Sequence, residues 1–201
     1  IDEHTLTYQW DQLRKDPFPI YAVMDKQCKQ EEDQDPWFEI SPLEAGYSLT
    51  GAFVETSSFG SQFCKGSKKK DHPETDMLYL QALCGSVLAD GDEIKKFLWK
   101  KIKDFFQHLI PTKEMKMLEK MSEALFLSIC RCMTQWIWGR KYNFLHKMTD
   151  ETVPAALLEG ETRDYIDAGL LLNSPYFSVL REERDIDLII SLDFSESDPF
   201  K

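Results

Sequence analysis

Asp167 is the side chain whose place in the sequence most strongly suggests chemistry. It precedes Ala168 and Gly169, a pattern that predicts a strand delivering a carboxylate to a turn. Open α/β sheets bind ligands in the crevice where strands end, and a carboxylate at such a point can reach into it. The alternative is that Asp167 only caps the turn, because Asp-x-Gly is also common turn chemistry.

The residues after Asp167 predict a loop and then a second strand. The sequence Asn-Ser-Pro-Tyr at 173–176 predicts a loop closed by proline. The apolar run from Ile186 to Phe194 predicts a buried strand. Asp167 is therefore expected where a strand meets an ordered loop.

Cysteine and histidine give no comparable signal. The five cysteines are odd in number and lack disulfide spacing, so we expect buried, reduced thiols and a cytosolic compartment. The four histidines are scattered without metal-ligand spacing, and no metal site is predicted. The cysteines are Cys28, Cys64, Cys84, Cys130 and Cys132, and the histidines are His4, His72, His108 and His146.

A basic amphipathic helix is predicted over residues 92–109. Its apolar side chains recur at three- and four-residue spacings, and its lysines occupy other positions. Such a helix can lie on a membrane that carries anionic lipid. It can also be a cap helix whose apolar face packs on its neighbours. The lysines are Lys95, Lys96, Lys100 and Lys103.

A second helix is predicted after Pro111, with apolar residues on one side from Leu118 to Trp136. Its methionines and aromatics either pack on the first helix or line a channel for an acyl chain. The remaining chain predicts conventional elements. They are a helix at 4–15, a strand at 19–24, an acidic loop at 28–36, a strand around Phe38, an exposed loop at 60–72 with a lysine triplet, and a helix at 76–88.

The net charge of −11 is unevenly distributed along the 201 residues. Residues 1–50 carry −7, residues 51–149 carry +5 and residues 150–201 carry −9. A chain with this acidic balance repels nucleic acid, which we do not expect as a partner. The chain has no apolar run near the ~20 residues that span a bilayer and no leader pattern, so we expect neither an integral nor a secreted protein.

Four motifs precede Asp167 in a fixed order. They are Pro-Ile-Tyr at 19–21, Trp-Phe-Glu-Ile-Ser-Pro-Leu-Glu-Ala-Gly-Tyr at 37–47, Gly-Ala-Phe-Val at 51–54 and Phe-Gly-Ser-Gln-Phe at 59–63. Together with the Asp167 stretch they resemble the second half of the catalytic domain in the cytosolic phospholipase A2 family. The short predicted lid and the block after Ser41 are most similar to its gamma-type branch.

This resemblance implies a patatin-like α/β fold with a helical cap, and a catalytic dyad of serine and aspartate without histidine. Asp167 matches the aspartate, and Arg184 matches an arginine that positions the phospholipid. Spacing alone does not exclude a Ser-His-Asp triad, but the resemblance favours the dyad. The chain would comprise a core segment at 1–90, a cap at 91–150 and a core segment with the aspartate at 151–201.

The family's serine lies on a Gly-x-Ser-Gly-Ser elbow, which this chain does not contain. The nearest imitation, Ser48, lacks glycine two places later, where a tight strand-to-helix turn needs a small residue. We therefore expect Ser48 to be structural and the chain alone to be inactive.

The activity implied by the resemblance is release of fatty acid from glycerophospholipids at a membrane surface. No cofactor is expected, and calcium is not expected in the chemistry. The implied location is the cytosol with peripheral association to intracellular membranes, where the 92–109 helix would make the contact. The alternatives are an inactive lipid-binding or regulatory module, and a patatin-like lysophospholipase or transacylase.

Overall fold

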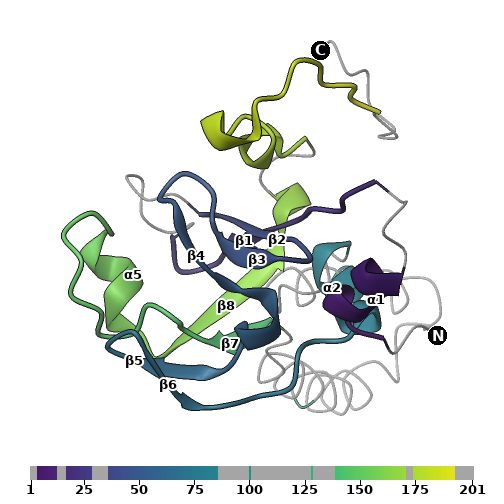
Figure 1. Cartoon of the computed structure of the whole chain (residues 1–201). Coiled ribbons are helices and arrows are strands. Elements are labelled where there is room, and N and C mark those ends of the chain that lie inside the picture. Colours follow the sequence, from purple (N-terminus) through teal and green to yellow (C-terminus); the bar gives the residue numbers. More distant parts are fainter. Residues whose placement is uncertain are drawn as a thin grey trace, which may run out of the picture.

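The structure of the chain is a computed structural model that describes residues 4–12, 17–28, 36–85, 100, 128, 139–170 and 174–192. A six-stranded sheet lies at its centre, in the order β4-β3-β2-β1-β8-β7, and each neighbouring pair is antiparallel (Figure 1). Its strands are β1 Tyr21–Asp25, β2 Trp37–Ile40, β3 Glu44–Tyr47, β4 Ala52–Glu55, β7 Arg140–Tyr142 and β8 Thr162–Asp167.

The register of the central strands determines which side chains share a face. Val23 in β1 lies opposite Phe38 in β2 and Asp167 in β8. Because successive side chains of a strand point to opposite faces, these three share one face. Trp37 and Glu39, the neighbours of Phe38, point to the other face. The sheet thus separates Asp167 from Glu39.

The main core lies on the face of Phe38. The Phe38 ring meets Tyr47 at 5.0 Å and Tyr165 at 4.5 Å between centroids, and Phe59 packs beside them. Edge-to-face and tilted aromatic pairs of this kind add stability beyond the area that they bury. All four side chains are buried, so an aromatic cluster joins three strands of the sheet.

Helix α2, Met77–Cys84, covers this core and packs against β8 and β1. Asp76 caps its first turn by accepting a hydrogen bond from the Tyr79 N–H at 2.8 Å. The helix predicted from residue 76 is therefore confirmed at its start, with Leu80 and Leu83 facing inward as expected. The rest of that prediction, beyond residue 85, lies outside the described residues.

Two shorter helices complete the described part: α1, Leu6–Gln12, and α5, Ala155–Glu159. Helix α1 lies within the predicted helix at 4–15, and an isolated bridge from Thr5 to Asp76 places its start beside α2. None of the described helices has the length and apolar character that crossing a membrane requires.

The region 60–72 differs from the loop that the sequence predicted. It forms a hairpin of β5, Gln62–Cys64, and β6, Ser67–Lys70. Lys65 and Gly66 make its two-residue turn with φ of 52° and 73°, the left-handed geometry that such hairpins prefer. The lysines of β6 are exposed as expected. Lysine is uncommon in strands, and the prediction therefore missed both strands of this hairpin.

The chain after Asp167 also differs from its prediction. It forms three short 3-10 helices, η4 Ala168–Leu170, η5 Tyr176–Ser178 and η6 Glu182–Arg184, and then an extended segment without strand pairing at 186–192. Figure 1 shows this segment running away from the sheet at the top of the view. The predicted buried strand is therefore wrong over 186–192, because no described strand pairs with it. Its exposed apolar residues are Ile186, Leu188, Ile189, Ile190 and Leu192.

The predicted cap falls largely outside the described residues. This applies to the helices expected at 92–109 and 118–136, where only residues 100 and 128 are described. Three of the five cysteines are described as free thiols; Cys28 is buried, and Cys64 and Cys84 are half-buried.

Candidate functional site

Asp167 is the last residue of β8, at the point where the strand turns into η4. The Gly169 N–H donates to its Oδ1 at 2.8 Å, and the residue is only 8% exposed. The predicted strand that ends in a carboxylate is thus confirmed. The carboxylate both caps the turn and has a second oxygen, Oδ2, for which no hydrogen bond is recorded within the described segments.

The thiol of Cys84 lies in the electrostatic field of Asp167. Burial raises the pKa of Cys84 to about 12, and the negative charge of Asp167 adds to the rise. At neutral pH the thiol stays protonated, and a protonated thiol is a poor nucleophile. Cys84 is therefore not a preformed thiolate nucleophile.

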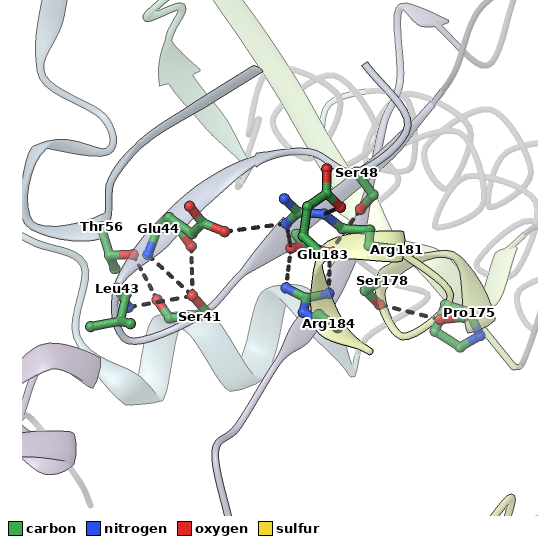
Figure 2. Close-up of polar contacts among 11 residues, drawn as sticks. Ser41, Leu43, Glu44, Ser48, Thr56, Pro175, Ser178, Arg181, Glu183 and Arg184 are labelled. Carbon is green, nitrogen blue, oxygen red and sulfur yellow. Dashed lines mark hydrogen bonds and ion pairs between the residues drawn. The ribbon is translucent and has the colours of Figure 1, made fainter. Parts of the chain in front are cut away.

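The opposite face of the sheet carries a second cluster, centred on Glu39 in β2. This carboxylate is 1% exposed and accepts hydrogen bonds from two arginines and a hydroxyl. Burying a carboxylate costs several kcal/mol unless charges and hydrogen bonds compensate it. Figure 2 shows the side chains of the arginines reaching the strands from the C-terminal segment.

Arg184 and Arg181 bind Glu39 in different ways. Arg184 donates from both terminal nitrogens, with Nη1 3.1 Å from Oε2 and Nη2 bonded to Oε1. Arg181 donates through Nη1 to Oε1 of Glu39 at 2.8 Å and to Glu44 at 3.2 Å. The short helix η6 and the residue before it thus place two guanidinium groups on one buried carboxylate.

A glycine makes room for the Phe53 ring, on which the Arg181 guanidinium stacks. In the sheet register Glu39 lies opposite Gly46, and Gly46 lies opposite Phe53. A Cβ at Gly46 would come within 2.5 Å of the Phe53 ring. Because that space is empty, the ring lies over the glycine, and the Arg181 guanidinium stacks on it at 4.2 Å.

Ser48 has the structural role predicted for it. Its hydroxyl donates to Oε2 of Glu39 at 2.9 Å, and the residue is 7% exposed. A serine nucleophile needs a base that is free to take its proton and an open path to substrate, but Glu39 is paired with two arginines and the Ser48 hydroxyl is buried. Ser48 is instead a buried donor that holds a carboxylate.

The structure does not bring the two predicted site residues together. Within the described segments no hydrogen bond or ion pair joins Asp167 to Arg184. Asp167 shares the face of Phe38, whereas Arg184 is bonded to Glu39 on the other face. The expectation of a ligand crevice at the strand ends applies to open, mostly parallel sheets, whereas the described sheet is antiparallel. Asp167 still lies at the end of a strand, as the sequence predicted.

A second buried carboxylate was not predicted. Asp25 is fully buried and accepts from the Tyr47 hydroxyl at 2.7 Å. The Arg163 guanidinium lies 3.2 Å from the same carboxylate oxygen. The signal for both clusters is an acidic residue inside a short apolar run, Val-Met-Asp at 23–25 and Trp-Phe-Glu-Ile at 37–40. Such residues are rarely buried without partners.

Metal binding finds no support among the described side chains. No group of three or more histidine, cysteine, aspartate or glutamate residues gathers there in a way that could hold an ion.

Comparison with known proteins gives consistent relatives, although no family model matches. Human cytosolic phospholipase A2 gamma is 27% identical over 256 residues, covering 92% of this chain and 47% of that protein. The mouse gamma protein is 26% identical with the same coverage, and mouse cytosolic phospholipase A2 zeta is 26% identical over 93% of this chain. The chain spans about half the length of the gamma-type proteins that it matches.

The solved structure of human GIVD cytosolic phospholipase A2 has the same fold. Its match has a TM-score of 0.65 and 22% identity, and covers 98% of this chain and 27% of that one. The described sheet and helices therefore form part of a patatin-like α/β fold, as the motifs implied. The resemblance predicted from those motifs is confirmed, and the chain is a relative of the cytosolic phospholipases A2.

Proposed function

We propose that this chain is the aspartate-bearing part of a phospholipid acyl hydrolase. The observation that carries the proposal is the carboxylate of Asp167 at the end of β8, in a chain related over nearly its whole length to phospholipases A2. Its substrate is a glycerophospholipid, and its products are a fatty acid and a lysophospholipid. In this proposal the chain comprises a core segment at 1–90, a cap at 91–150 and a core segment with Asp167 at 151–201.

Asp167 acts as the general base of a serine–aspartate dyad. The serine hydroxyl attacks the ester carbonyl, and its proton passes to the Asp167 carboxylate. The same proton then goes to the leaving alcohol, and water releases the fatty acid from the acyl-enzyme. A carboxylate is a weak base in water, so direct contact with the hydroxyl is required. The low exposure of Asp167 and its Oδ2, which accepts no hydrogen bond from the described residues, suit this contact.

The serine of the dyad lies outside this chain. Ser48 is occupied by Glu39, and the thiol of Cys84 stays protonated at neutral pH. These two observations argue against Ser48 and Cys84 as the nucleophile. The chain alone is therefore inactive, and an alcohol acceptor such as a lysophospholipid can replace water in the complete enzyme.

Arg184 binds the phosphate of the lipid. Its guanidinium is 18% exposed and uses only two of its five N–H groups on Glu39. The remaining donors suit phosphate oxygens, for which arginine is the preferred partner. Because Asp167 lies on the other face, Arg184 must approach it when the complete domain assembles around a lipid.

The protein works in the cytosol and meets its substrate at intracellular membranes. The basic helix predicted at 92–109 supplies the peripheral contact, aided by anionic lipid. The chemistry needs no calcium.

Fatty-acid release from phosphatidylcholine vesicles tests the proposal. We would compare this chain with a protein extended at its N-terminus to include a serine elbow, and with Asp167→Asn in the extended form. Activity only in the extended protein, abolished by D167N with vesicle binding retained, is expected. Activity of the chain alone would contradict the assignment of Ser48, and activity of D167N would remove Asp167 from the dyad.

A further inference from the structure

The extended segment 186–192 exposes an unusual amount of apolar surface. Five of its seven residues are isoleucine or leucine, and their exposed fractions run from 40% for Ile189 to 75% for Ile190. Its one charged residue is Asp187. None of the described strands pairs with the segment. An extended apolar segment with unpaired backbone groups is a template for another strand.

The order of residues in this segment determines what a partner must supply. In a strand, side chains two residues apart share a face. One face would be wholly apolar, with Ile186, Leu188, Ile190 and Leu192. The other would be mixed, with Asp187, Ile189 and Ser191. A partner must therefore provide both a strand for the backbone groups and an apolar layer for the first face.

The residues just before the segment are fastened to the sheet. Arg184, at the end of η6, donates two hydrogen bonds to Glu39 in β2, and Arg181 donates another. The ring of Trp37, also in β2, stacks on Phe177 with 4.5 Å between centroids. These contacts attach the chain on both sides of residue 180, so the exposed segment begins at a fixed point.

Asp185 sets the direction in which the segment leaves that point. It follows η6 with φ of 47° and ψ of 53°, a left-handed conformation that is uncommon outside glycine. Beyond it the chain runs away from the sheet (Figure 1). The exposed apolar residues are thus presented from an anchored turn.

The described sheet leaves no position for a further strand beside Asp167. Strand β8, which ends in Asp167, lies between β1 and β7, and the outer strands of the described sheet are β4 and β7. A serine that contacts Asp167 directly cannot arrive on a strand paired with β8. It must approach the end of β8 from a separate layer of the protein.

From these observations we propose that residues 186–192 form a strand of a second sheet, completed by the serine-bearing part of the protein outside this chain. This inference rests on the proposed function, which places the serine there. That part supplies a neighbouring strand and an apolar layer over Leu188 and Ile190. The relatives have room for it, because human cytosolic phospholipase A2 gamma matches 92% of this chain over only 47% of its own length.

Other occupants satisfy the segment less completely. A lipid surface would cover the apolar side chains but offers no hydrogen bonds to the backbone of an extended chain. A second copy of the chain could pair strand to strand, but an isolated pair of strands is marginally stable in water. A folded part with a sheet and a core of its own meets both requirements.

Hydrogen exchange followed by mass spectrometry tests the inference. The amides of 186–192 would be compared in this chain and in the extended protein with the serine elbow. Fast exchange is expected in the chain, and exchange about a hundredfold slower in the extended protein. Fast exchange in both would overturn the inference. Protection in the chain alone that rises with its concentration would identify a second copy, and protection only with phosphatidylcholine vesicles would identify lipid; either would overturn it.

Ile190→Asp and the matched control Leu43→Asp sharpen the test. Leu43 is 63% exposed in the turn between β2 and β3. In this chain both variants should stay within about 2 °C of the wild-type Tm, because both sites are exposed. In the extended protein I190D alone should lower the Tm, by about 10 °C, because its carboxylate is buried without a partner.

Ile190→Ala keeps the comparison decisive if the extended I190D protein does not fold. It removes apolar surface without adding a charge, so its Tm should fall in the extended protein and not in this chain. Equal Tm changes in the two proteins would contradict the inference.

Exchange and activity together separate this inference from the proposed function. An extended protein that protects 186–192 but releases no fatty acid would overturn the proposed function alone. An active extended protein with fast exchange in the segment would overturn the inference alone. Fast exchange without activity would overturn both.

Discussion

Asp25 and Glu39 are two buried carboxylates on opposite faces of one sheet, and they differ in the arginines that surround them. Each accepts a hydrogen bond from a hydroxyl, and the two donors, Tyr47 for Asp25 and Ser48 for Glu39, are adjacent in the sequence. Asp25 has one arginine, Arg163, whereas Glu39 has two. The first cluster pairs one arginine with one carboxylate, and the second pairs two arginines with Glu39 and Glu44.

The difference indicates what each cluster contributes. Asp25 and Arg163 both come from strands of the sheet and are 0% and 5% exposed, so their pairing fixes the core. The arginines on Glu39 come from the C-terminal segment and remain partly accessible. Removing one partner of the fully buried pair leaves an uncompensated charge in the core, whereas water can solvate the partly accessible arginines on Glu39.

Asp25→Asn should have the largest effect on stability. It leaves the Arg163 guanidinium buried without a counter-charge, which costs about 3–5 kcal/mol in comparable pairs. Urea unfolding followed by circular dichroism measures the loss, with exposed Glu151→Gln as the control. A loss below that of E39Q would reverse the comparison between the clusters.

Glu39→Gln should destabilise less, by about 1–3 kcal/mol, because its arginines can be partly solvated and Arg181 retains Glu44. The same unfolding curves measure it. Limited proteolysis of residues 174–192 should accelerate, since three hydrogen bonds from that segment to Glu39 are weakened. Equal proteolysis in E39Q and wild type would show that Trp37 and Phe177 suffice for attachment.

The paired hydroxyls allow a finer comparison. Tyr47→Phe removes a fully buried hydroxyl donor to Asp25, which keeps its bonds from the Gln27 and Cys28 N–H groups, and should cost about 1.5–3 kcal/mol. Ser48→Ala leaves Glu39 its arginines and should cost about 1 kcal/mol. Thermal unfolding of the two variants at equal concentration measures the difference. Equal losses of stability would show that Asp25 and Glu39 depend equally on their hydroxyl donors.

Cys84 reports the charge of Asp167 with the smallest effect on the fold. Its pKa is raised from 9.0 to about 12, so the unfolded chain loses this proton first and stability falls as pH rises from 9 towards 12. Asp167→Asn should lower the thiol pKa and speed alkylation of Cys84 at pH 9. Mass spectrometry of iodoacetamide-treated protein identifies the site, and an unchanged rate would place Asp167 too far away to act on it.

The sequence predicted elements whose signals are local. Asp76 predicted the start of α2, and the apolar residues around Phe38 predicted β2. The position of Asp167 at a strand end was also local, because the turn follows at once. The family motifs then supplied the fold class, which periodicity alone would not distinguish.

The failures concern partners far away in the chain. Arg181 and Glu39 are 142 residues apart, and nothing near either one shows the pairing. The apolar residues at 186–192 suggested burial, yet burial of a strand needs a neighbour, and none of the described strands pairs with them. The hairpin at 62–70 was missed because its register depends on the Lys65–Gly66 turn more than on strand-forming residues.

Tyr47 and Ser48 are adjacent donors on opposite faces of the sheet, so their contacts depend on the alternation of side chains along β3. A deletion or insertion of one residue between Glu44 and Tyr47 would turn every following side chain to the opposite face. The phenol would then meet the arginine cluster, and Asp25 would lose its hydroxyl. Natural length variation should therefore avoid this strand and accumulate in the loops on either side of it.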